Sequence, residues 1–206
     1  MQALENIKSR LRSVGIAPCI AASAGLVALI TIWLNRRTIT SAVQSAAVSI
    51  RNAMNNSYFT ISELCASSVA KAKGIDNTPS DTVKANLQNL IDNVLDPLRE
   101  AYGKPIVINS GYRSTALNKA VGGVSGSQHL TGNAADIRGE GNTKAELIAI
   151  AKVALQQGNY DQLIFEHPGS GLWLHISYNG SANRGQFMYY NGKYANLPTS
   201  GWESRV

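Results

Sequence analysis

Three residues in the C-terminal half of the chain have the types and spacing of a metal site. His129 and Asp136 lie seven positions apart in the segment SQHLTGNAAD, and His175 lies in the segment WLHIS. Two imidazoles and one carboxylate leave a tetrahedral zinc ion with one open position, where water can bind and become acidic. This ligand count suits a catalytic zinc site better than a closed structural one. The alternative is that both histidines are ordinary surface or hydrogen-bonded side chains.

The residues between the two paired ligands favour the metal-site interpretation. Gly132, Ala134 and Ala135 are small and suit a tight turn followed by a short strand. Such a turn would return Asp136 toward His129. The spacing therefore predicts that the two side chains meet.

A further candidate is Arg113, in the segment SGYRS that follows the apolar stretch 105–109. That stretch is expected to be a short buried strand, which places Arg113 at a strand end. A guanidinium there can hold a carboxylate through two parallel hydrogen bonds, so a substrate with a free carboxylate would suit it. The alternative is an ion pair at the surface.

Four segments occur in the order seen in zinc D-Ala-D-Ala carboxypeptidases: FTISEL at 59–64, SGYRS at 110–114, SQHLTGNAAD at 127–136 and WLHIS at 173–177. More narrowly, the chain resembles the short, often phage-encoded members of that peptidase family, whose fold is shared with the hedgehog signalling domain. The resemblance covers about Tyr58 to Leu197. The histidine motifs together with the arginine motif make it specific.

The resemblance implies a function and a set of site residues. Peptidoglycan stem peptides would be the substrate class and Zn²⁺ the cofactor, held by His129, Asp136 and His175. Substrate-binding roles would fall to Arg113, which would also serve catalysis, and to Ser127 and Gln128, which open the histidine motif.

The general base is less evident, because many relatives place a glutamate or histidine three residues before the last zinc histidine and this chain has Leu172 there. We predict that Glu166 replaces it. Glu166 ends the expected strand 161–166, whose antiparallel pairing with 172–178 could bring the carboxylate beside the metal. His167 would lie on the other face unless a turn at Pro168 reorients it. Glu166 could otherwise be a solvated strand-end carboxylate.

The N-terminal segment has the pattern of a membrane anchor. Ser13 to Asn35 is a run of 23 residues without charge, long enough to span a bilayer, and basic residues flank it on both sides. Its length and the following Arg36-Arg37 pair favour an uncleaved signal anchor over a cleaved signal peptide. A buried core helix is the alternative, although Trp33 beside Asn35 resembles an interfacial end.

The expected organisation is a basic segment (1–12), a transmembrane anchor (13–35), a helical stalk (36–56) and a zinc peptidase domain (57–206). With the N-terminus inside, the domain would lie on the periplasmic, cell-wall side of a bacterial inner membrane. The oligomeric state is open.

Charge and cysteine content narrow the possible partners. Residues 1–56 hold six basic residues and one acidic residue, whereas residues 57–206 hold 13 and 12. The nearly neutral body gives little support to a basic phosphate-binding face, so no nucleic acid partner is expected.

Cys19 and Cys65 are expected to be small buried residues, Cys65 in the middle of a helix, rather than a disulfide.

Hydrophobic periodicity and capping residues predict an α+β domain with a small antiparallel sheet and flanking helices, preceded by the N-terminal transmembrane helix. The resemblance implies that this domain has the hedgehog/D-Ala-D-Ala-peptidase fold. The expected helices are 60–74, 78–103 with Pro79 at the first position, and 143–157 with a capping box. The expected strands are 105–109, 161–166, 172–178 and a hairpin at 187–195 with a type I′ turn at Asn191-Gly192.

Three functions remain open at this point. The first is a membrane-anchored zinc peptidase, encoded by a phage or prophage, that cleaves peptidoglycan stem peptides. Its activity would be of the D,D-carboxypeptidase or L,D/D,D-endopeptidase type. The second is a wall-binding module that keeps zinc without efficient catalysis, which Leu172 favours. The third is a signalling or adhesion domain on the hedgehog-like scaffold, which fold alone does not exclude.

Overall fold

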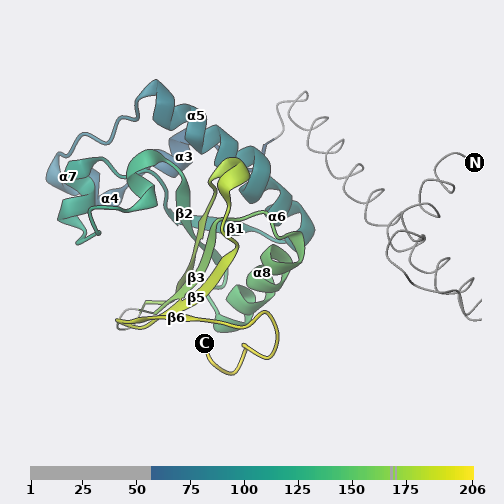
Figure 1. Cartoon of the computed structure of the whole chain (residues 1–206). Helices are drawn as coiled ribbons and strands as arrows, with labels where there is room; N and C mark the ends of the chain where they lie inside the picture. The colour runs from purple at the N-terminus through teal and green to yellow at the C-terminus, as the bar shows by residue number, and fades with distance from the viewer. Residues whose placement is uncertain (1–56, 168, 170) are drawn as a thin grey trace, which may run out of the picture. The chain divides into compact units, whose positions relative to one another are not determined.

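The computed structural model describes residues 57–167, 169 and 171–206 (Figure 1). The predicted basic segment, anchor and stalk, together with Cys19, lie outside the described residues. Within the described part of the chain, no helix combines the length and apolar character needed to cross a bilayer.

A six-stranded sheet forms the centre of the domain, in the order β1-β2-β4-β3-β5-β6. The strands are β1 (Ile106–Ser110), β2 (Ala134–Gly139), β3 (Gln162–Glu166), β4 (Trp173–Ser177), β5 (Gln186–Tyr190) and β6 (Tyr194–Asn196). The predicted strands are confirmed to within one or two residues. The sheet is mixed, however, because β5 pairs parallel with β3 while all other neighbours are antiparallel. The prediction of a purely antiparallel sheet is wrong at this pair, since the chain passes from β4 across to the far side of β3.

The helices pack around this sheet. They are α3 (Ile61–Cys65), α4 (Ser68–Lys73), α5 (Asp81–Leu90), the π-helical turn η1 (Ile91–Leu95), α6 (Asp96–Tyr102), α7 (Thr115–Ala120), α8 (Lys144–Gln157) and the short 3₁₀ turns η2 (Gln128–Thr131) and η3 (Gly180–Ala182). In Figure 1, α6 and α8 lie on the same side of the sheet. The predicted helix 143–157 is confirmed with its capping box between Thr143 and Glu146.

Two details of the predicted helices are wrong. The helix expected over 60–74 is divided into α3 and α4, because Ala66 is extended and the Ser67 side chain accepts a hydrogen bond from Ala70 N to start a new helix. Pro79 is not the first residue of α5, since Ser80 caps that helix by accepting from Val83 N. Cys65 is consequently the last residue of α3 and is only half-buried, rather than buried in mid-helix.

The hairpin between β5 and β6 also differs from its prediction. Tyr190 pairs with Tyr194, which leaves a three-residue loop at 191–193. Gly192 has a φ of 95°, but among the described residues Asn142 is the sole non-glycine residue with positive φ. A type I′ turn needs positive φ at both central residues, so the predicted turn type is wrong.

The main core lies between the sheet and α8. Leu147, Ile150 and Ala151 of α8 are fully buried, as are Ile137 of β2 and Leu174 of β4. The side chains alternate along these strands, so the residues between the core positions point to the opposite face. That opposite face carries the polar buried residues Asp136 and His175.

The C-terminal segment closes the core at one end, which the sequence did not indicate. Trp202 is 2% exposed, and its ring centroid lies 5.3 Å from that of Phe165 on β3 and 5.0 Å from that of Phe187 on β5. The contact joins the tail to the two strands that pair in parallel. An aromatic ring buried in this way stabilises through its large apolar area and its edge contacts.

We therefore expect Trp202→Ala to lower the free energy of unfolding by about 3–5 kcal/mol, the range for removing a buried aromatic ring. Urea unfolding followed by circular dichroism measures the change. Glu203→Gln is the matched control, because Glu203 lies beside Trp202 in sequence and its side chain forms an ion pair with Lys152 outside the core. Equal losses in both variants would contradict a packing role for the indole.

Candidate metal centre and groove

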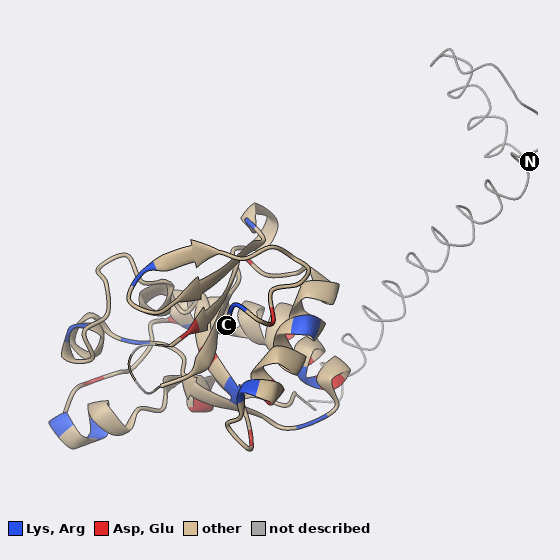
Figure 2. Cartoon of the chain, turned by 90° about the horizontal axis from the view of Figure 1, so that it is seen from below, with Lys and Arg blue, Asp and Glu red and all other residues tan. Residues whose placement is uncertain are grey.

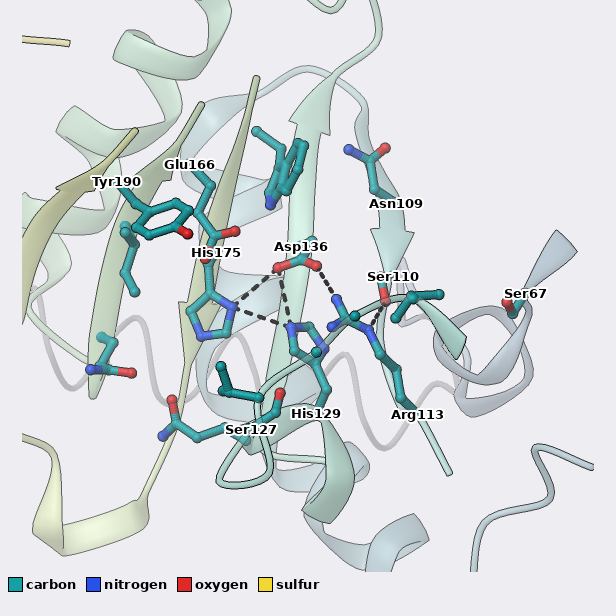
Figure 3. A pocket seen from close by; sticks show the side chains of 18 of the residues that line it. Ser67, Asn109, Ser110, Arg113, Ser127, His129, Asp136, Glu166, His175 and Tyr190 are labelled. Atoms are coloured by element: carbon teal, nitrogen blue, oxygen red, sulfur yellow. Dashed lines mark hydrogen bonds and ion pairs between the residues drawn. The ribbon is translucent and has the colours of Figure 1, made fainter. Parts of the chain in front are cut away.

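His129, Asp136 and His175 meet on the sheet face opposite α8. Asp136 of β2 and His175 of β4 are direct register partners, and η2 brings His129 beside them. His129 Nε2 lies 3.2 Å from Asp136 Oδ1 and 3.2 Å from His175 Nδ1, which itself lies 3.1 Å from Asp136 Oδ1 (Figure 3). All three side chains are buried. The predicted cluster is therefore assembled by residues up to 46 positions apart.

The donor set fits a metal ion. His129 Nδ1 lies 2.6 Å from the carbonyl oxygen of Gly111, which can only accept, so Nδ1 carries the proton and Nε2 presents its lone pair. That lone pair faces a carboxylate oxygen and a second imidazole nitrogen, so the three ligand atoms converge on one point where a cation could bind. Bonds of about 2.0–2.1 Å in a tetrahedron separate the ligand atoms by about 3.3 Å, close to the spacing here.

The turn between the two paired ligands forms as predicted. Gly132 ends η2 with a φ of 74°, and a Cβ there would lie 2.9 Å from Val83 O. A side chain at this position would meet both an unfavourable backbone conformation and the backbone of α5. β2 begins two residues later and carries Asp136 back to His129.

Arg113 contacts the metal-ligand cluster from the end of β1. Its Nη2 donates to Asp136 Oδ2 at 2.5 Å, its Nε donates to Ser110 Oγ at 2.8 Å, and its backbone N donates to His129 O. The Arg113 contact occupies one oxygen of the carboxylate, so the other oxygen alone faces the histidines. The predicted position of Arg113 at a strand end is confirmed, and the structure adds an orienting contact to a metal ligand that the sequence did not indicate.

The charge of Asp136 is maintained by its neighbours. Burial acts to raise the pKa of the carboxyl group, but His129 and His175 outweigh it and hold the pKa well below its ordinary value. Asp136 is thus ionised at neutral pH, as a metal ligand must be.

Glu166 ends β3 beside the cluster. The predicted antiparallel pairing of β3 with β4 is confirmed, with Ile164 opposite His175 and Glu166 opposite Trp173. Figure 3 shows the Glu166 carboxylate on the same face as His175. Its pKa is raised, first by burial and then by the charge of Asp136.

The two other residues considered for the base lie elsewhere. His167 is exposed, its Nδ1 is 3.5 Å from the Tyr189 hydroxyl, and it does not line the groove that holds the cluster. Leu172 packs against the hydrophobic core. Of the described residues near the end of β3, Glu166 is thus the one whose position suits proton transfer.

Ser127 and Gln128 line the groove, and Gln128 is held by a buried network that the sequence did not reveal. Its Nε2 donates to Asp161 Oδ2 at 2.8 Å, and Arg184 donates to both oxygens of the same carboxylate. Asp161 is fully buried, and the hydrogen bonds from Arg184 lower its pKa to about 2. No local pattern joins Asp161 to Arg184, because the two residues are brought together only by the path of the chain from β4 to β5.

The cluster lies in a groove of about 590 Å³ that extends well beyond the three ligands. Ser67 and Ser68 at the start of α4, with Asn109 and Arg113, line one part, and the loop 121–127 lines another. Trp173, Tyr190 and Tyr194 line it near Glu166. The sequence did not indicate these three aromatic residues, although the predicted antiparallel pairing of 161–166 with 172–178 could have placed Trp173 beside Glu166.

Charged residues elsewhere on the domain are interspersed. Figure 2 shows Lys and Arg distributed over several elements, with Asp and Glu among them. Within the groove, Arg113, Asp136 and Glu166 bring one basic and two acidic side chains together.

Comparison with known proteins agrees with this geometry. A family model described as Peptidase M15 matches residues 57–177. The chain is also 37% identical over 84 residues to a curated protein from Streptomyces albus G named zinc D-Ala-D-Ala carboxypeptidase. That match covers 40% of this chain and 32% of the relative, so the chain spans about a third of the relative's length.

We expect single alanine substitutions of His129, Asp136 and His175 each to remove most of the zinc affinity, because each side chain supplies one of three protein bonds to the ion. Isothermal titration with zinc and elemental analysis of the purified protein measure affinity and stoichiometry. His167→Ala is the matched control and should retain one zinc per chain. Unchanged affinity in all three ligand variants would refute the site.

Proposed function

The chain belongs to the peptidase M15 family, and from this we propose that it is a zinc-dependent peptidase acting on peptidoglycan stem peptides. The observation that carries the proposal is the convergence of His129, Asp136 and His175 around one point inside a substrate-sized groove. The name of the Streptomyces albus G relative supports zinc as the metal and a D-Ala-D-Ala peptide as the substrate.

When bound, zinc would lower the pKa of a coordinated water to about 7 and polarise the scissile carbonyl group. The chain's own residues then have separate tasks. Arg113 holds Asp136 in a one-oxygen ligand geometry, and the Gly111 carbonyl fixes the tautomer of His129. Glu166 accepts the proton of the attacking water and returns it to the leaving amine, which is the work of a general acid–base residue.

Arg113 also supports recognition of a substrate carboxylate. Its side chain is 16% exposed and lines the groove, and among the described residues its Nη1 forms no hydrogen bond. A guanidinium that binds Asp136 through one nitrogen can still present donors to a second carboxylate. We therefore assign Arg113 two roles, orientation of Asp136 and binding of the C-terminal carboxylate of the peptide.

A wall-binding module without catalysis is the second candidate, and the presence of Leu172 at the position of the usual base favours it. In that case, the zinc ion would stabilise the groove, and muropeptides would bind there without being hydrolysed. The position of Glu166 beside the cluster supports the enzyme over this alternative.

We further propose that residues 13–35 anchor the protein in a bacterial inner membrane, with the peptidase domain on the periplasmic, cell-wall side. The uncharged length of this segment and its basic flanks support the proposal. The location also agrees with the proposed substrate. The resemblance to short, often phage-encoded peptidases is the basis for proposing a phage or prophage gene.

Glu166→Gln should lower turnover of an N-acylated peptide ending in D-Ala-D-Ala by about 10²- to 10⁴-fold, the usual contribution of general acid–base catalysis. Glutamine keeps the size of the side chain but cannot take up the proton. Zinc content and thermal midpoint should stay unchanged, which separates chemistry from folding. Loss of activity in His167→Ala with full activity in Glu166→Gln would transfer the role to His167.

Arg113→Lys should lower kcat/KM by roughly tenfold or more on peptides with a free C-terminal carboxylate, because lysine cannot form the paired hydrogen bonds of a guanidinium. Peptides with an amidated C-terminus should lose less. Zinc affinity is measured in parallel, because loss of the contact between Arg113 and Asp136 would lower it. Equal losses on both kinds of peptide would assign Arg113 to orientation of Asp136 alone.

For the anchor, we expect protease added to spheroplasts to degrade the domain 57–206 while a membrane-protected N-terminal fragment persists. Immunoblotting with antibodies against each part follows the two segments. A periplasmic marker protein and a cytoplasmic one serve as controls for access. Full protection of the domain in sealed spheroplasts would place it inside and overturn the proposed orientation.

A further inference from the structure

Four side chains form a row across the sheet next to the metal cluster. Trp173 of β4 is the register partner of Glu166 of β3, Glu166 is the partner of Tyr190 of β5, and Tyr190 is the partner of Tyr194 of β6. Register partners on neighbouring strands point to the same face of a sheet. All four side chains line the groove. The row thus continues the active-site surface from Glu166 to the edge of the sheet.

The two tyrosines at the end of this row form a unit. Their ring centroids are 4.5 Å apart with planes tilted by 39°. Tyr194 is 56% exposed, so most of its ring is not used in packing the core. The pair offers ring faces and hydroxyl groups to whatever lies in the groove, a combination that suits ligands with both apolar and polar parts.

The positions of Arg113 and the tyrosine pair define how a bound peptide would run through the groove. Figure 3 shows Arg113 on one side of the His129–Asp136–His175 cluster and Tyr190, with Glu166, on the other. If Arg113 holds the C-terminal carboxylate and the bond is cut at the cluster, the leaving group lies toward Arg113. The acyl half of the substrate then extends toward the tyrosines.

The size of the groove agrees with a substrate longer than two residues. Its volume of about 590 Å³ falls within the range of sites that hold drug-sized ligands. A free dipeptide placed between Arg113 and the cluster would leave the part beside Tyr190 and Tyr194 without a ligand. The hairpin that carries both rings has no other evident use in the described site.

We propose that Tyr190 and Tyr194 form a subsite for the part of the peptide on the acyl side of the cleaved bond, so that the protein selects a peptide continuing beyond the cleaved residue over a free dipeptide. This inference rests on the proposed peptidase function and deepens it by assigning the residues that bind the acyl-side part of the substrate. The subsite makes the protein a carboxypeptidase or endopeptidase of stem peptides rather than a dipeptidase.

The test compares two probes that share their C-terminal end: the free dipeptide D-Ala-D-Ala and an N-acylated tripeptide L-Lys-D-Ala-D-Ala. In zinc-loaded full-length protein, the ratio of kcat/KM for the tripeptide to that for the dipeptide should fall about tenfold in Tyr194→Ala and in Tyr190→Ala. Tyr194→Phe, which keeps the ring, should retain most of the ratio. Tyr58→Ala is the control, because Tyr58 is 47% exposed and lies outside the groove.

The outcomes separate this subsite from the function on which it rests. A kcat/KM ratio that is unchanged in both alanine variants would overturn the subsite. If kcat/KM falls equally on the two probes and the thermal midpoint is lowered, the tyrosines have a structural role and the subsite is likewise overturned. If the wild type cleaves neither probe, calorimetry of the same peptides on the zinc-loaded protein decides. Tripeptide binding that weakens about tenfold in the tyrosine variants would uphold the subsite while the peptidase function fails. No tripeptide binding in the wild type would overturn both.

Discussion

The ion pair between Arg113 and the buried carboxylate of Asp136 is the contact on which the site depends. A buried carboxylate is costly unless it is paired and hydrogen-bonded. Arg113 satisfies one oxygen of Asp136 at 2.5 Å, and the other oxygen is left to face two imidazole nitrogens. Because Arg113 also donates its backbone N to His129 O, the same residue links β1 to the element that carries the first histidine. Removing the Arg113 side chain would leave the buried Asp136 carboxylate without its ion-pair partner.

The pairing of the strands fixes which side chains lie next to this cluster. Strand register, rather than loop conformation, sets the separation of His175 from Ile164 and of Glu166 from Trp173 and Tyr190. Groups mounted on paired strands are held more rigidly than groups on loops, which suits both metal binding and proton transfer. The parallel pairing of β5 with β3 has a functional consequence, since it places Tyr190 rather than a surface loop beside Glu166. Trp202 stabilises that arrangement by packing on Phe165 and Phe187 of the same two strands.

Local patterns in the sequence predicted most of the site, and chain topology decided the rest. The turn at Gly132, the strand that returns Asp136 to His129 and the pairing that places Glu166 near the cluster follow from small residues and from period-two alternation. The antiparallel sheet was wrong at β3 and β5, because strand order depends on where a connection crosses and not on the strand itself. The contact between Asp161 and Arg184 and the row that ends in Tyr194 were missed for the same reason. Helix boundaries failed at Ala66 and Pro79, where a serine cap competed with a longer helical stripe.

Mass spectrometry of purified muropeptides after incubation with the zinc-loaded protein tests the central claim most directly. We expect muropeptides with intact stem peptides to lose a peptide fragment whose mass identifies the cleaved bond. A chelator should abolish the loss, and added zinc should restore it, since His129, Asp136 and His175 are the proposed ligands of the catalytic ion. Muropeptide masses that stay unchanged while the protein holds zinc and retains the muropeptides would contradict the account, because the cluster would then serve binding without hydrolysis.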